Sequence, residues 1–233
     1  MSLRFLVVVS MLLLSFASVS AQDPQVSIKA GSTLVSGENY ELAIREYERV
    51  TAKDHDAYAQ ANYNIGVCYF ELYRNEQAIE YFKRAIGLRK GDYPRASYAL
   101  GFALEEQNKL NEADAAYYDA VVSSHNDYAP ASFRRGVIAA KKGKVEVAAD
   151  LFREASKHRG PHLPNGLNNL GVMLARMGNL SEAEKVFEYA VRQSRGTSSD
   201  AEQNLKLCRS LLLSAANRTV VLELKLAASD LPR

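Results

Sequence analysis

The feature that most constrains this chain is an interval of 35 residues at which the same residue types return. Glycine recurs at five positions with this spacing, and an alanine follows each glycine after twelve residues. An aromatic residue comes four positions after each alanine, and alanine or valine comes three positions later. The four rows are Gly31, Gly66, Gly101, Gly136 and Gly171; Ala43, Ala78, Ala113, Ala148 and Ala183; Tyr47, Phe82, Tyr117, Phe152 and Phe187; Val50, Ala85, Ala120, Ala155 and Ala190. A fixed period of this length is typical of repeat proteins whose units pack against their neighbours.

The spacing inside each unit predicts two helices. Apolar residues such as Ile65, Tyr69 and Leu72 surround Gly66 at helical intervals. A glycine inside a helix costs about 1 kcal/mol relative to alanine, and close approach of a second helix would compensate that cost. We therefore expect each glycine to abut the alanine twelve residues downstream on its partner helix. Short polar turns should join the two helices, at residues 37–39, 74–75, 107–109, 142–144 and 177–179.

This pattern resembles the tetratricopeptide repeat family, most closely at residues 63–69, 76–85, 169–172 and 181–187. The resemblance covers roughly residues 24–197. It implies an all-α, right-handed α-solenoid of stacked helix-turn-helix repeats. The five repeats would occupy residues 22–197, at about 24–58, 59–93, 94–128, 129–163 and 164–198. Arg135 departs from the pattern because Ala30, Ile65, Leu100 and Leu170 hold the equivalent positions. The fourth repeat would then either pack less well there or expose this arginine for use.

After the repeats, residues 199–233 are interpreted as a C-terminal capping helix and a tail. A further first helix is predicted at about residues 200–213, and its polar character is what a capping unit needs. In the tail, Val220, Leu222, Leu224 and Leu226 alternate as in a strand, whereas Leu222 and Leu226 also fit a helix. We favour a closing helix. The alternatives for residues 217–233 are a strand or a segment that occupies the groove of the array.

The first 21 residues have the composition of a signal peptide. Arg4 precedes an apolar run over residues 5–16, and Val19 and Ala21 are small residues at the spacing of a cleavage site. The alternative is a retained membrane anchor, but the run of about 12 residues is shorter than the roughly 20 that a spanning helix needs. We predict cleavage after Ala21, a periplasmic or secreted protein, and no stable membrane span afterwards.

Charge and motif content narrow the possible functions. The 29 basic and 27 acidic residues nearly balance, which gives no reason to expect a nucleic-acid partner. Cys68 and Cys208 lie four periods apart, so one solenoid cannot bring them together, and we expect both to be small core residues. Gly160 and Pro161 separate His158 from His162, which favours a solvated turn over a metal site. The sequence therefore predicts no catalytic residues, no cofactor and no metal.

In the resembled family, the first helices line a concave groove along which ligand peptides lie. The resemblance implies the following groove residues: Tyr63, Asn64, Val67, Phe70, Arg95, Tyr98, Phe102, Phe133, Arg134, Val137, Lys141, Asn168, Asn169 and Val172. Such a surface would accept an extended or helical segment with apolar anchors and an acidic group. The alternative is that its aromatic side chains simply pack between neighbouring first helices.

The function expected from these observations is that of a non-catalytic scaffold or adaptor for an unidentified protein partner in the cell envelope or secretory path. A second hypothesis is a non-catalytic regulatory subunit of an envelope enzyme or secretion complex. A hydrolase that uses groove carboxylates ranks last, because no nucleophile motif or phosphate-binding loop is present in the sequence.

Overall fold

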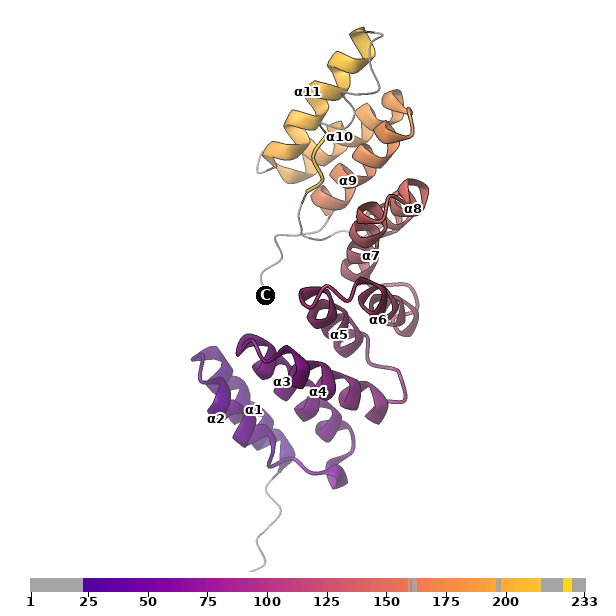
Figure 1. The fold of residues 1–233 in the computed structure, drawn as a ribbon. Helices are drawn as coiled ribbons and strands as arrows, with labels where there is room; N and C mark the ends of the chain where they lie inside the picture. The colour runs from indigo at the N-terminus through magenta and orange to yellow at the C-terminus, as the bar shows by residue number, and fades with distance from the viewer. Residues whose placement is uncertain (1–22, 159, 161–162, 196–197, 215–223, 228–233) are drawn as a thin grey trace, which may run out of the picture.

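The structure is a computed structural model that describes residues 23–158, 160, 163–195, 198–214 and 224–227. The signal-peptide prediction lies outside these residues. All regular secondary structure in the described part is helical, which confirms the predicted all-α solenoid, and Figure 1 shows the helix pairs following one another in a curved stack. The elements are α1 (Pro24–Ser36), α2 (Tyr40–Tyr47), η1 (Ala52–Asp54), α3 (Asp56–Glu71), α4 (Asn75–Leu88), α5 (Pro94–Glu106), α6 (Leu110–Ser123), α7 (Ala129–Lys141), α8 (Val145–Ala155), α9 (Leu163–Arg176), α10 (Leu180–Ser194) and α11 (Ser199–Ser214).

Each hairpin turns through three residues, of which the second has a positive φ angle. This position is occupied in turn by Glu38, Tyr73, Asn108, Gly143 and Gly178, again 35 residues apart. A left-handed residue ends a helix because it redirects the chain and lets following amides bond to the last carbonyl groups. Four of the predicted turns are confirmed. The turn predicted at residues 74–75 is wrong in position, because the observed turn spans residues 72–74 and Asn75 begins α4.

The nearest contact at the glycines of the 35-residue row is an aromatic ring rather than the predicted alanine. A side-chain carbon built on Gly101 would lie 2.6 Å from a ring carbon of Tyr117, and one on Gly136 would lie 2.7 Å from Phe152. The nearest neighbour of these glycines is therefore the aromatic ring sixteen residues downstream, and at Gly66 the carbonyl oxygen of Ala78, twelve residues downstream, also lies within 3.3 Å of the added carbon. The alanine row is fully buried beside these rings. The ring is large enough to fill the space between the two helices, and the absence of a side chain on glycine lets it lie flat on the backbone.

Gly101→Ala should lower the free energy of unfolding by about 1–2 kcal/mol. Overpacking against Tyr117 costs about 1–3 kcal/mol, and the gain in helix propensity offsets up to about 1 kcal/mol. The matched control is Gly87→Ala in α4, where no atom lies within 4 Å of the added carbon. That change should stabilise the chain by about 0.5–1 kcal/mol. Urea titration followed by circular dichroism checks both values, and a shift of the same sign in the two variants would contradict the glycine–aromatic packing.

Arg135 is neither an exposed side chain nor a packing defect. Its Nε donates a hydrogen bond of 2.9 Å to Asp114 Oδ1, and its guanidinium carbon lies 4.8 Å from the ring centroid of Tyr118. Both partners belong to α6, the helix that precedes it in the stack. Arg135 is half-buried and stabilises the junction between α6 and α7 through an ion pair and a cation–π contact.

The C-terminal part of the array bears out one prediction and contradicts another. Helix α11 forms where a further first helix was predicted, and it packs against α9 and α10. The closing helix is wrong for Leu224–Ala227, because these four residues are not helical. They cross α9 and α11 instead, as the yellow trace in Figure 1 shows. Among the described helices, none is both long enough and apolar enough to cross a bilayer.

Both cysteines are buried thiols in separate clusters of the core. Burial raises the pKa of Cys68 to about 12 and also raises the pKa of Cys208. Because the thiolate is the reactive form, alkylation of the native chain by iodoacetamide at pH 8 should be at least about 100-fold slower than in the urea-unfolded chain. The alkylation rate of native Cys68 should keep rising with pH up to its raised pKa of about 12, above the pH at which an ordinary thiol is already ionised. Mass spectrometry measures the labelling, and rapid labelling of either cysteine in the native chain would contradict this burial.

Candidate functional site

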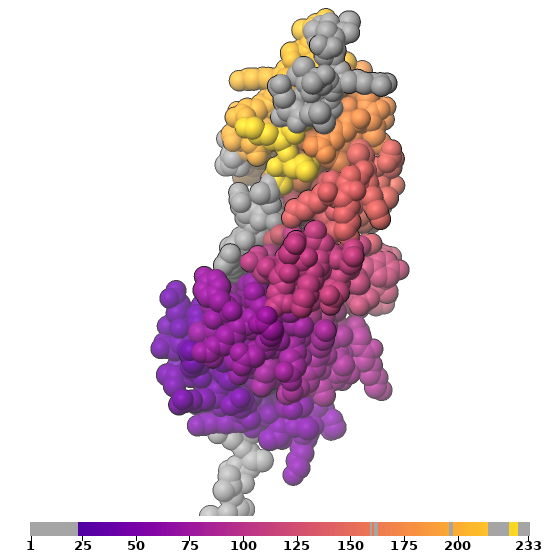
Figure 2. Space-filling view, viewed as in Figure 1, coloured from indigo at the N-terminus to yellow at the C-terminus, as the bar shows by residue number. Residues whose placement is uncertain are grey.

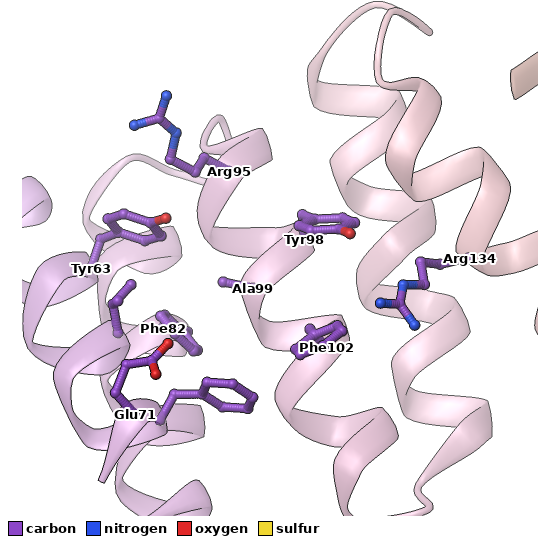
Figure 3. Close-up of a pocket in the computed structure, with 10 residues that line it drawn as sticks. Tyr63, Glu71, Phe82, Arg95, Tyr98, Ala99, Phe102 and Arg134 are labelled. Atoms are coloured by element: carbon purple, nitrogen blue, oxygen red, sulfur yellow. The ribbon is translucent and has the colours of Figure 1, made fainter. Parts of the chain in front are cut away.

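A cavity of about 180 Å³ opens on the side of the array formed by the first helices. Helices α3, α5 and α7 contribute most of its wall, and Figure 3 shows Tyr63 and Glu71 facing Tyr98 and Phe102 across it. Phe82 of α4 closes its floor from the second layer. The wall is largely apolar, with two arginines at the margins. The residues around it are Tyr63, Val67, Phe70, Glu71, Phe82, Arg95, Tyr98, Ala99, Phe102 and Arg134.

The aromatic side chains of the cavity are held by contacts between rings. The centroids of Phe70 and Phe102 lie 5.4 Å apart across neighbouring first helices. Tyr63 packs on Phe82 at 5.9 Å, and Tyr98 packs on Tyr117 at 5.4 Å, so each is braced by its own hairpin. The same rings therefore pack between helices and line the cavity. Burial raises the pKa of Tyr63 to about 12, which keeps its hydroxyl neutral.

Arg134, which lines the cavity, belongs to a charged cluster around Glu105. The Glu105 carboxylate accepts a hydrogen bond of 3.0 Å from the Tyr117 hydroxyl and lies 3.6 Å from Arg134 Nη1 and 3.5 Å from Lys141 Nζ. The Arg134 guanidinium also lies over the ring of Phe102, 4.6 Å from its centroid. Burial, and next the charge of Glu105, raise the pKa of Tyr117, so it stays a hydrogen-bond donor. Glu105 therefore neutralises Arg134 and fixes its position against the apolar wall.

The second arginine of the cavity, Arg95, differs from Arg134 in its ion pairing. Arg95, on the first turn of α5, is exposed and makes no ion pair with any residue in the described part of the chain. The charge of Arg95 is therefore available to an acidic group of a ligand, whereas the charge of Arg134 is already paired with Glu105.

The other predicted groove residues fall into three groups. Phe133 and Val172 are buried in the core, and Val137 packs against the same cluster, so these three do not line the open cavity. Asn64 is half-buried on α3, and Lys141 is exposed beside Glu105. The last two residues, Asn168 and Asn169, are fully buried because the segment 224–227 covers them.

That segment is bound through its main chain. Asn169 Nδ2 donates to the carbonyl oxygen of Ala227 at 3.1 Å, and Asn169 Oδ1 accepts from the Ala227 amide at 2.7 Å. Asn204 of α11 does the same to Lys225, with distances of 2.8 Å and 2.9 Å. Asn168 Nδ2 adds a third donor, 3.1 Å from the carbonyl oxygen of Lys225. The first helices thus hold an extended peptide through asparagine side chains.

Sequence reasoning missed Glu105 and Asn204 as site residues. Both could have been found by comparing equivalent positions of the repeats. Glu105 occupies the position that Phe70, Ala140 and Ala175 hold in other repeats, so a carboxylate appears in an apolar row. Asn204 is one period after Asn169, which places the two amides at equivalent points on successive first helices.

The comparisons with known proteins identify the repeat. A family model described as tetratricopeptide repeat matches residues 28–93, 74–129, 98–164 and 135–198, which together span well over half of the sequence. The chain belongs to the tetratricopeptide repeat family. No curated protein matches the sequence.

Several solved structures share this tetratricopeptide repeat fold. The MamA protein is 21% identical, with 74% of this chain and 92% of that chain covered and a TM-score of 0.61. YrrB, described as a tetratricopeptide repeat protein with an unusual peptide-binding site, is 23% identical over 75% of this chain and 88% of that chain, with a TM-score of 0.58. PilW, described as a widely conserved type IV pilus biogenesis factor, is 18% identical over 87% and 90%, with a TM-score of 0.61. At these identities, the likeness shows the fold alone.

Proposed function

We propose that this protein is a non-catalytic scaffold that binds an extended segment of a partner protein along its first helices. The observation that carries the proposal is the aromatic cavity between α3, α5 and α7. It lies on the same row of first helices as the asparagines that hold a main chain at the C-terminal end of the array. An apolar pocket supplies affinity through burial, and main-chain recognition supplies alignment. The peptide-binding site named for YrrB is compatible with this role.

The chemistry of the cavity indicates what kind of segment would bind. Phe70, Tyr98 and Phe102 offer apolar surface to one aliphatic or aromatic side chain. Arg95 at the margin would attract an acidic residue beside that anchor, because it has no described ion-pair partner of its own. The preferred ligand is therefore an extended stretch with one apolar anchor and a neighbouring carboxylate.

The proposed location is the periplasm or another secretory compartment. It rests on the predicted signal peptide with cleavage after Ala21. The likeness to PilW, a pilus biogenesis factor by its description, is compatible with the cell envelope. A regulatory subunit of an envelope enzyme or secretion complex is the second candidate. It would be distinguished by co-purification with that enzyme at a fixed stoichiometry.

Site-specific photo-crosslinking in the native cell tests the proposal. A photoreactive phenylalanine analogue replaces Phe102 in the cavity, and the matched control places it at Tyr118, which is 51% exposed on α6. We expect a discrete crosslinked protein from position 102 and none from position 118. A partner captured equally from both positions, or only from position 118, would move the binding surface to the second helices.

A further inference from the structure

Two charges of opposite sign lie at opposite ends of the aromatic cavity. Arg95 is the second residue of α5, whereas Glu71 is the last residue of α3, and both line the cavity. In Figure 3, Tyr63 and Arg95, near the starts of their helices, lie at one end, and Glu71 and Phe102 lie at the other. The two first helices therefore run in the same direction, with a basic margin at their amino ends and an acidic margin at their carboxyl ends.

Neither of these charges is matched within the described part of the chain. Arg95 is exposed and Glu71 is half-buried, and neither forms an ion pair or a side-chain hydrogen bond with a described residue. Glu105, by contrast, is paired with Arg134. A carboxylate that loses part of its hydration beside aromatic rings costs free energy unless a cation compensates it. Glu71 therefore favours a ligand that brings a positive charge to the acidic margin.

Both charges also oppose the dipoles of their own helices. The amino end of a helix carries a partial positive charge that favours acidic residues, and the carboxyl end favours basic ones. Other first helices follow this rule, with Asp56 in the first turn of α3 and Lys141 in the last turn of α7. Arg95 and Glu71 have the reverse arrangement. Helix stability does not explain them, and each adds to the helix dipole potential at its margin.

The described part of the tail does not supply the missing counter-charges. Residues 224–227 lie on α9 and α11, and none of them lines the cavity. Figure 2 shows their yellow atoms against the orange helices of the last repeats, whereas the cavity belongs to the purple and magenta repeats. A partner segment is therefore the occupant that the two charges fit.

We propose that the cavity selects a segment with an acidic residue on one side of its apolar anchor and a basic residue on the other. The acidic residue pairs with Arg95, and the basic residue pairs with Glu71. This inference rests on the proposed function and defines the charge pattern of its ligand. It adds a requirement for a basic residue, which the pairing of an acidic group with Arg95 does not contain.

The span between the two margins fits an extended segment. Arg95 lies one period after Gln60, and Gln60 precedes Glu71 by eleven residues, so the two margins are about 16 Å apart along the helix axis. In an extended chain, the second residues before and after the anchor point to the same face as the anchor and lie about 13 Å apart. The side chains of the charged residues bridge the remaining distance.

Selection of peptides from a random library tests the charge pattern. Phage that display random decapeptides are selected on the immobilised full chain, and peptides that also bind Phe102→Glu are discarded because they do not use the cavity. The retained peptides should be enriched several-fold in an acidic residue two positions to one side of an apolar anchor. They should be enriched equally in a basic residue two positions to the other side.

Charge reversal of each margin makes this test specific. Arg95→Glu should shift the selected pattern to basic residues on both sides, and Glu71→Lys should shift it to acidic residues on both sides, because each margin attracts the opposite charge. The two reversals together should restore one acidic and one basic residue. The matched controls are Lys83→Glu on α4 and Glu112→Lys on α6, both exposed on second helices, and they should leave the pattern unchanged.

Neutral variants separate binding from folding. Arg95→Gln and Glu71→Gln should each weaken the binding of a synthesised copy of a selected peptide about two- to five-fold, measured by fluorescence anisotropy. Neither variant should lower the melting temperature measured by circular dichroism, because each removes a charge that the helix dipole disfavours. A fall of more than about 2 °C in either variant would show that the charge has a structural partner and would overturn the proposal.

The library distinguishes failure of this inference from failure of the proposed function. Selected peptides that depend on Phe102 but lack the basic residue, or whose charges do not respond to the reversals, would overturn the charge pattern and leave peptide binding in the cavity standing. If no selected peptide depends on Phe102, the proposed function fails, and the charge pattern fails with it.

Discussion

Phe152→Ala should lower the free energy of unfolding by about 3–5 kcal/mol, as is usual when a large aromatic side chain is removed from a core. Phe152 is fully buried. Its ring fills the space above Gly136 and packs on Phe133 with centroids 5.6 Å apart. Neither neighbour can move into the vacated space easily, because glycine has no side chain and Phe133 is itself buried. The cost should therefore lie towards the upper part of this range.

Denaturation in urea, followed by circular dichroism, measures this effect. The control is Val147→Ala on the same helix, where the side chain is 50% exposed, and we expect a change below about 0.5 kcal/mol. Because each repeat contacts its neighbours only, the loss at Phe152 should also uncouple the two halves of the array and reduce the steepness of the transition. Equal effects of the two substitutions would be incompatible with the packing described for the aromatic row.

Phe102→Glu should weaken partner capture by about 30-fold or more, the effect expected when a central anchor of an interface is lost. Phe102 lies between the ring of Phe70 and the guanidinium of Arg134. Since Arg134 is already paired with Glu105, the new carboxylate would be an additional negative charge in an apolar cavity. It would also repel the acidic group that we expect on the ligand.

Capture of the partner by the purified full chain measures the effect, with Tyr118→Glu on α6 as the exposed control. Circular dichroism should show the same helicity for both variants. Arg134 is less useful for this purpose, because Arg134→Glu would place two carboxylates together and disturb the cluster around Glu105. Full retention of capture by Phe102→Glu would show that the partner binds elsewhere.

Much of the fold could be predicted from the sequence because the 35-residue period is itself a structural constraint. Identical spacing of glycine, alanine and aromatic residues determines which face of every helix is buried, and the helices form where that spacing places them. The period could not reveal which atoms meet across a hairpin. The glycines abut the aromatic row because a ring reaches further than the methyl group of an alanine such as Ala113.

The site was only partly predictable, since its decisive features interrupt the repeat. Glu105 is charged where equivalent residues are apolar, and its burial depends on Arg134 and Lys141 from the next repeat. Alternating leucines in the tail are compatible with a strand, a helix or a bound peptide, and local propensity cannot separate these. The contacts that decide between these conformations come from Asn169 and Asn204, which are distant from the tail in sequence and form hydrogen bonds with its main chain.

The most direct test of the central claim is a crystal structure of the full chain bound to the segment that a photoprobe at position 102 captures. Our account predicts an extended peptide along α3, α5 and α7, with an apolar side chain between Tyr98 and Phe102 and an acidic group near Arg95. A segment bound to the second helices α4, α6 and α8, with the aromatic cavity left open, would contradict it.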